Sequence, residues 1–119
     1  MAATIVQSAK GTSTSATVTA SFSTTPTNGN LIVLCFAADD YNGTPNSGWT
    51  ESTGMRQHTF HGSYLWWRVA SGGSNSFQYT SGSATNSSWV LLEISGLDVS
   101  PYDVSNGQYA TGTAKTYST

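Results

Sequence analysis

The sequence carries little charge for its length. Charged residues make up 8% of its 119 residues, against roughly 25% in a typical soluble domain. The four basic residues, Lys10, Arg56, Arg68 and Lys115, are spread along a chain of net charge −2 and cannot neutralise a row of nucleic-acid phosphates. We therefore exclude nucleic acid as a partner. Ser and Thr fill close to a third of the chain, which indicates the polar, uncharged surface typical of extracellular or virion proteins.

Long hydrophobic runs and cysteine pairs are also missing. The longest apolar run, Leu31 to Ala38, is far shorter than the ~20 residues of a membrane-spanning helix, and no basic segment with a cleavage site opens the sequence. We expect neither a membrane span nor a secretion signal. The single cysteine, Cys35, excludes an intrachain disulfide, and its place within LIVLCFA predicts a buried small hydrophobic residue.

No segment keeps the 3.6-residue period of a helix, whereas several alternate with the two-residue period of a strand. In residues 16–22, Ala16, Val18, Ala20 and Phe22 alternate with polar residues, which predicts a half-buried strand. Residues 3–8 predict a preceding strand that ends at a Lys10-Gly11 break. We expect these first two strands to lie at or near sheet edges.

Later segments predict the interior of the sheets. Residues 31–37 are apolar on both faces, so we expect a central strand covered on each side, and residues 89–94 predict a second central strand. Strands are also expected at 49–55, at 59–69 and around Phe77 and Tyr79. About seven short strands separated by Gly, Ser and Asn loops predict an all-β fold, an antiparallel two-sheet β-sandwich of jelly-roll type.

The chain is of a length for one domain, covering residues 1–119. Residues 100–119 are too polar to form an inner strand. We expect this C-terminal segment to pack on a neighbouring subunit or to complete a sheet there.

Four stretches resemble a jelly-roll module of phage tail and other virion proteins and of large secreted bacterial proteins: Gly29–Leu34, Gly48–Thr50, Leu65–Ala70 and Trp89–Asp98. The resemblance covers roughly residues 3–110, and its motifs are a rhythm of hydrophobic strands with a Trp before a Glu-x-Ser-Gly-Leu ending. That module usually continues for several more strands, whereas this sequence ends at Thr119. The resemblance implies a structural or interaction role and carries over no catalytic residues.

Aromatic residues offer a candidate binding site. Tyr64 and Trp66 alternate along one strand face, Arg68 continues that face, and Trp49 comes from a nearby segment. Flat rings stack on the apolar faces of sugars, so these four residues form a candidate glycan platform. The alternative is that the rings belong to the core or to a subunit contact.

Polar clusters give weaker candidates. Asp39, Asp40 and Asn42 supply the oxygen ligands that calcium prefers, although they lack EF-hand spacing, and in a turn they would cap their own backbone. His58 and His61 are three apart, and in one strand such residues point to opposite faces, so we expect no metal site there.

Glu93 lies between apolar residues of its strand. It could therefore be an inward carboxyl with a raised pKa, but we expect it to face solvent or to pair with Arg56 or Arg68.

These observations favour a non-enzymatic virion structural or adhesive subunit, on a capsid or tail, that contacts copies of itself or other virion proteins. Uncharged faces can pack against one another without like-charge repulsion. The alternative function is a carbohydrate-binding module, with calcium as its only candidate cofactor. No nucleophile, phosphate loop or carboxylate pair points to an enzyme.

Overall fold

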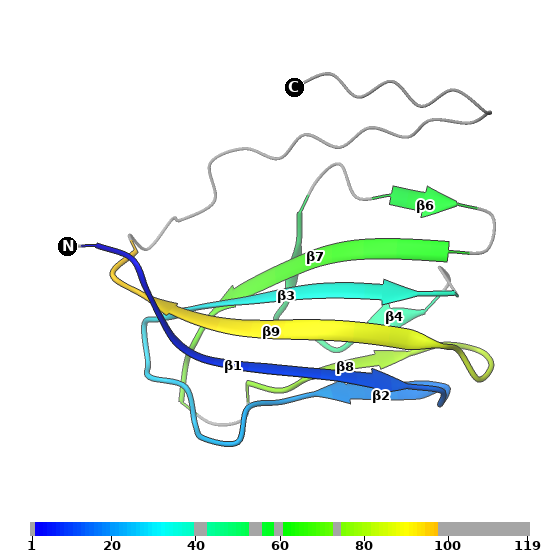
Figure 1. Ribbon diagram of the computed structural model, residues 1–119, viewed down its shortest axis with the longest axis horizontal. Coiled ribbons are helices and arrows are strands. Elements are labelled where there is room, and N and C mark those ends of the chain that lie inside the picture. Colours follow the sequence, from blue (N-terminus) through cyan, green and yellow to red (C-terminus); the bar gives the residue numbers. More distant parts are fainter. Residues whose placement is uncertain (1, 40–42, 53–55, 59–60, 73–74, 98–119) are drawn as a thin grey trace.

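A computed structural model describes residues 2–39, 43–52, 56–58, 61–72 and 75–97 (Figure 1). These residues form nine strands: β1 (Thr4–Ser13), β2 (Thr17–Ala20), β3 (Leu31–Ala38), β4 (Thr44–Pro45), β5 (Thr50–Glu51), β6 (Arg56–His58), β7 (His61–Val69), β8 (Phe77–Thr80) and β9 (Ser87–Ser95). Within the described ranges there is no helix, and hence none long and apolar enough to cross a membrane.

The strands form two antiparallel sheets. The large sheet has the order β1-β9-β3-β7-β5, with β6 also paired to β7, and the small sheet has the order β2-β8-β4. The chain passes back and forth between them, because β2, β4 and β8 each lie between strands of the large sheet in sequence. The predicted all-β two-sheet sandwich is confirmed, and the jelly-roll resemblance stays a prediction.

The core fills the space between the sheets with aromatic rings. The ring centroid of Phe36 on β3 lies 4.8 Å from that of Tyr79 and 5.7 Å from that of Phe77, both on β8. Trp66 on β7 lies 4.8 Å from Phe77 and stacks on Tyr64 at 4.7 Å. Tilted and offset pairs at these distances stabilise a core beyond the area they bury. The face of each strand that carries these rings therefore points inward.

The predicted positions of β1, β2, β3 and β9 are confirmed. The first two strands end the large and small sheets, and β3 and β9 are neighbours inside the large sheet. The predicted break at Lys10-Gly11 is wrong, because β1 continues to Ser13 with Gly11 opposite Trp89 of β9. A Cβ atom on Gly11 would lie 2.6 Å from the Trp89 ring, so this glycine leaves room for the indole within an unbroken strand.

One expectation about β3 is also wrong. Ile32, Leu34, Phe36 and Ala38 are buried against the small sheet, whereas the alternate residues of β3 are exposed or half-buried. The small sheet covers only one face of β3. We call the opposite face of the large sheet the outer face. Residues 100–119, expected to form an assembly segment, lie outside the described residues.

Candidate functional site

The outer face is built from residues that stand in rows across β7, β3, β9 and β1. Strand pairing places Val33 opposite Trp67 on one side and Leu92 on the other, and Leu31 opposite Val69 and Ile94. Ile5 on β1 pairs with Ile94 and extends the second row to the sheet edge. Because the side chains of a strand alternate between faces, all these residues point away from the core.

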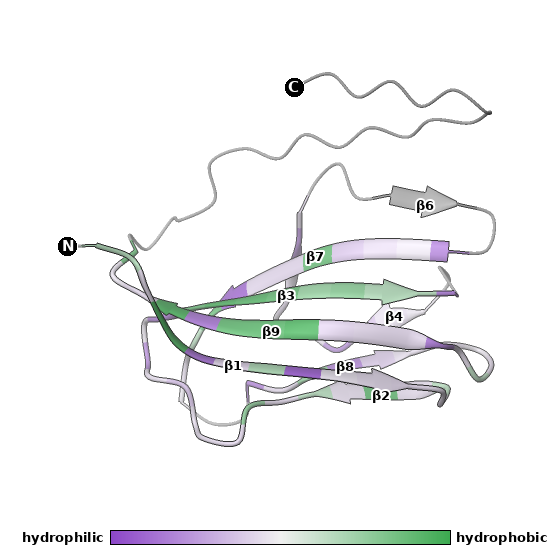
Figure 2. Ribbon diagram, in the orientation of Figure 1, coloured by the Kyte–Doolittle hydropathy of each residue, from purple (hydrophilic) through white to green (hydrophobic). Residues whose placement is uncertain are grey.

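We call seven residues of the outer face the outer apolar patch: Ile5, Leu31, Val33, Val69, Val90, Leu92 and Ile94. Ile5 is 60% exposed, Val90 42% and Val69 36%, and the other four are half-buried. Figure 2 shows the hydrophobic residues concentrated in β3, in much of β9 and at the start of β1. Half-buried Trp67 lies in the row of Val33. The outer face is thus apolar at the end of the sheet where β7 and β3 pair through Val69 and Leu31.

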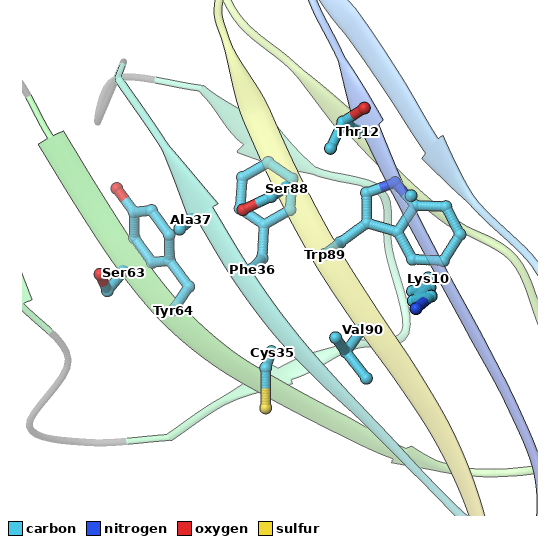
Figure 3. A pocket seen from close by; sticks show the side chains of 11 residues that line it. Lys10, Thr12, Cys35, Phe36, Ala37, Ser63, Tyr64, Ser88, Trp89 and Val90 are labelled. Carbon is cyan, nitrogen blue, oxygen red and sulfur yellow. The ribbon is translucent and has the colours of Figure 1, made fainter.

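The other end of the outer face is hollowed. Strand pairing aligns Ser63, Ala37, Ser88 and Thr12 in one row across the four strands, and their small side chains leave an open hollow of about 720 Å³ above the sheet. We call this the outer hollow. Its rim is formed by Lys10, Cys35 and Val90, which lie side by side on β1, β3 and β9 (Figure 3). A second, smaller hollow of about 460 Å³ continues toward Asp39, His61 and Asn86.

Cys35 lies between the two halves of the outer face. Its register partners are Leu65 on β7 and Val90 on β9, and its thiol is exposed. The prediction that Cys35 is buried is therefore wrong. The apolar sequence around Cys35 indicated a strand covered on both faces. Cys35 and the alternate residues of β3 on its side of the sheet, however, face away from the small sheet.

The candidate glycan residues are placed together, but two of them are not exposed. Tyr64 is 5% and Trp66 1% exposed, and both belong to the aromatic core. An exposed platform that includes them is wrong, and the alternative that they are core residues is confirmed. Trp49 packs edge-on against Phe77 at 5.3 Å between ring centroids, and the guanidinium carbon of Arg68 lies 5.7 Å from the Trp49 ring centroid.

That corner keeps two buried polar atoms without a hydrogen-bond partner among the described residues, Nε1 of Trp49 and Nε of Arg68. The cation–π contact between the two side chains accounts for the position of the guanidinium. Arg68 therefore contributes to packing at the edge of the core and does not continue an exposed aromatic row.

Among the calcium candidates, Asp39 is described, and Asp40 and Asn42 lie outside the described residues. Both carboxylate oxygens of Asp39 accept hydrogen bonds from the loop before β9. Thr85 donates from its hydroxyl, and Asn86 donates from its backbone N–H at 2.8 Å and its side-chain amide at 2.6 Å. Hydrogen bonds from Thr85 and Asn86 lower the pKa of Asp39. The described role of Asp39 is thus to hold this loop against the end of β3.

His58 and His61 do not lie in one strand. They end β6 and begin β7, and the antiparallel hairpin makes them register partners. The expectation assumed a single strand, and the two residues lie in paired strands instead. The described residues contain no group of three His, Cys, Asp or Glu side chains that could hold a metal ion.

Glu93 faces inward and is fully buried, so the expectation that it faces solvent or pairs with an arginine is wrong. Its carboxylate accepts hydrogen bonds from Nε2 of Gln7 at 2.6 Å, Nδ2 of Asn30 at 2.6 Å and the backbone N–H of Thr27 at 2.9 Å. Burial alone would raise the pKa of Glu93, but these hydrogen bonds outweigh it and lower the pKa below its usual value. Glu93 therefore links β1 and the loop before β3 to β9.

Sequence reasoning missed the outer apolar patch. The signal was present in part, because Leu65, Trp67 and Val69 alternate with Tyr64, Trp66 and Arg68 along β7, and either set could have faced the core. The periodicity alone could not decide between them. Comparisons with family models, with curated proteins and with solved structures found no match to this chain.

Proposed function

We propose that this protein is a structural or adhesive β-sandwich subunit that acts through protein–protein contacts made by the outer face of its large sheet. Its partner is a copy of itself or another protein of the same assembly, and the setting that suits its composition is a virion or an extracellular structure. The function involves no catalysed reaction.

The observation that carries this proposal is the outer apolar patch. Its seven branched apolar residues adjoin one another across four strands, and three of them are more than a third exposed. Monomeric soluble proteins rarely expose a contiguous apolar patch larger than a few hundred Å², and such patches mark interaction sites. A sheet face that buries these side chains against a partner would remove them from water at a gain of ~25 cal/mol per Å².

The charge distribution supports the same function. We consider the described rows that run across β7, β3, β9 and β1, from the row of Ser63 to the row of Val69. Among their outward-facing residues, only Lys10 carries a charge. The cores of protein interfaces are depleted in charged residues in the same way. A partner therefore meets no ionic group at the centre of this face, and no charged residue there must lose its hydration.

The alternative function, a carbohydrate-binding module with an exposed aromatic platform, has less support. Two of its four platform residues, Tyr64 and Trp66, are core residues. Their rings cannot stack on a sugar while they fill the space between the sheets.

Static light scattering over a concentration series tests the proposed function. We expect the wild-type protein to associate, and Leu92→Asp, which places a charge in the patch, to weaken association at least tenfold in Kd. The matched control is Thr19→Asp, which adds the same charge at an exposed position of β2 on the small sheet. Equal molar masses for wild type and Leu92→Asp across the whole series would contradict a contact role for the outer face.

A further inference from the structure

We propose that the outer face binds a second copy of this chain about a two-fold axis that crosses the strands at Cys35, so that the outer apolar patch of each copy fills the outer hollow of the other. The inference rests on the proposed function and deepens it, because it names the partner and the arrangement of the two copies.

The outer face has large side chains on one side of Cys35 and small side chains on the other. On one side of Cys35, β3 presents Val33 and Leu31, flanked by Leu92 and Ile94 of β9. On the other side, β3 presents Ala37, flanked by Ser63 and Ser88 in the floor of the hollow. Large side chains on one side and small ones on the other give the face a ridge and a depression. A surface of this form is complementary to a copy of itself.

Symmetry fixes how the copies meet. In a face-to-face dimer, a two-fold axis parallel to the strands would place ridge on ridge and leave the hollows empty. An axis that crosses the strands reverses the order of the rows and places ridge on hollow. With the axis at Cys35, Val33 of one copy lies over Ala37 of the other, two residues from the axis in each case. The row of Leu31 then lies over the row of Asp39, in the second hollow. The contact is then isologous and closes as a dimer.

The size of the face matches this partner. Four strands ~4.8 Å apart and eight residue steps of ~3.3 Å give a flat area of about 500 Å². Two such faces bury about 1,000 Å² in total, which is the lower end of the range for a specific interface. A small ligand would cover only the hollow and would leave the outer apolar patch in water.

The charge on the face also permits a second copy. Lys10 is exposed on the edge strand β1, at the rim of the hollow. The flexible lysine stem lets its ammonium group turn to solvent at the periphery of a dimer. The axis along the Cys35 row also places the two Lys10 residues over each other, at the edge of the contact where their ammonium groups can turn apart. The rows of β3 and β9 between Leu31 and Ala37 bring no like charges together.

The native cysteine provides the first test. Packed sheets lie ~10 Å apart, whereas a disulfide requires Cα atoms within about 7 Å. In the proposed dimer, two copies of Cys35 face each other across the axis. Because the contact covers Cys35, a short bis-maleimide reaches the two thiols only as the dimer opens. It should join the two copies at a rate set by that opening, and a simple thiol oxidant should not join them. The control is the double variant Cys35→Ser with Thr19→Cys, which moves the only cysteine to the small sheet and should give little cross-linked product.

A volume exchange along β3 provides the second test. Val33→Ala removes part of the ridge and Ala37→Val fills part of the hollow, and each change occurs twice in a symmetric dimer. We expect each single variant to weaken association about tenfold or more. Val33→Ala removes buried methyl groups from the contact, and Ala37→Val makes the added side chain collide with Val33 of the other copy. In the double variant, the valine now at position 37 of one copy lies over the alanine now at position 33 of the other, so a large side chain again meets a small one. Its Kd should return to within about threefold of wild type. Thermal unfolding of each variant establishes that the fold is kept.

The outcomes separate the inference from the proposed function. Cross-linking through Cys35 together with rescue in the double variant supports the dimer. An associating protein that neither cross-links through Cys35 nor shows rescue overturns this dimer but leaves an assembly role through another surface. A protein that stays monomeric at high micromolar concentration overturns both. A monomer in which Cys35 resists labelling also overturns the dimer.

Discussion

Asn30 donates a hydrogen bond of 2.6 Å from its side-chain amide to the carboxylate of Glu93, and this contact joins the loop before β3 to the C-terminal part of β9. Gln7 donates to the other carboxylate oxygen from β1, and Thr24 donates its hydroxyl to the side-chain oxygen of Gln7 at 2.7 Å. The network thus connects β1, the residues between β2 and β3, and β9. It holds the edge strand β1 on the large sheet, where β1 supplies Ile5 and Lys10 to the outer face.

This network makes stability depend on pH. The pKa of Glu93 is lowered in the folded protein, so its ionised form stabilises the fold above the pKa of the unfolded chain. That contribution is lost as the pH falls from about 4.5 through the lowered pKa of the folded state. We expect the free energy of unfolding, measured by urea denaturation between pH 7 and pH 3, to fall with pH. Glu93→Gln should be less stable at pH 7, by about 1–3 kcal/mol, because its amide nitrogen meets hydrogen-bond donors.

The control for this prediction is Asp39→Asn, since the pKa of Asp39 is also lowered, at an exposed site far from Glu93 in the sequence. The acid loss of stability should persist in that variant and flatten in Glu93→Gln. Identical pH profiles for Glu93→Gln and wild type would show that the buried carboxylate does not drive the acid sensitivity.

Gly11 should not tolerate a side chain. A Cβ atom at this position would lie 2.6 Å from the indole of Trp89, which extends from β9 across β1 (Figure 3). We expect Gly11→Val to lower the free energy of unfolding by about 1–3 kcal/mol through overpacking. Gly82→Ala is the comparison, because nothing lies within 4 Å of its added Cβ. Equal stability of Gly11→Val and wild type in urea would contradict the close packing of the indole.

Trp66→Ala should act on stability. The side chain is 1% exposed and packs on Tyr64 and Phe77, so its removal leaves a cavity between the sheets. We expect a loss of about 3–5 kcal/mol in the free energy of unfolding. Trp66→Phe should cost less, since it keeps a ring in the same space. A Trp66→Ala protein as stable as wild type would show that the ring does not lie in the core.

Alternation in the sequence predicted most of the strands, and the fold class followed from them. It could not decide which of two apolar faces is covered. Cys35 and Phe36 are neighbours in one apolar run, and only the position of the small sheet makes one exposed and the other buried. The same ambiguity on β7 placed Trp66 on the predicted platform. The sequence pattern divided the residues of each strand into two alternating sets, one for each face. The packing of the second sheet decided which set is buried.

Other differences arose from contacts between distant residues. Gly11 looked like a break in the strand because Trp89, whose indole occupies the space that a side chain at Gly11 would fill, is far away in the sequence. Glu93 looked like a surface residue or half of an ion pair because three neutral donors, from β1 and the loop before β3, reach it only in the folded chain. The rows of the outer face likewise depend on register, which a single sequence does not reveal.

The rate at which Cys35 reacts with a small thiol reagent, measured against protein concentration, tests the central claim most directly. Cys35 is exposed in the single chain and lies at the middle of the outer face, between its apolar patch and its hollow. We predict fast labelling of the dilute folded protein and progressively slower labelling as concentration rises, with fast labelling retained in Leu92→Asp at every concentration. A rate that does not change with concentration in a protein that light scattering shows to associate would contradict the account.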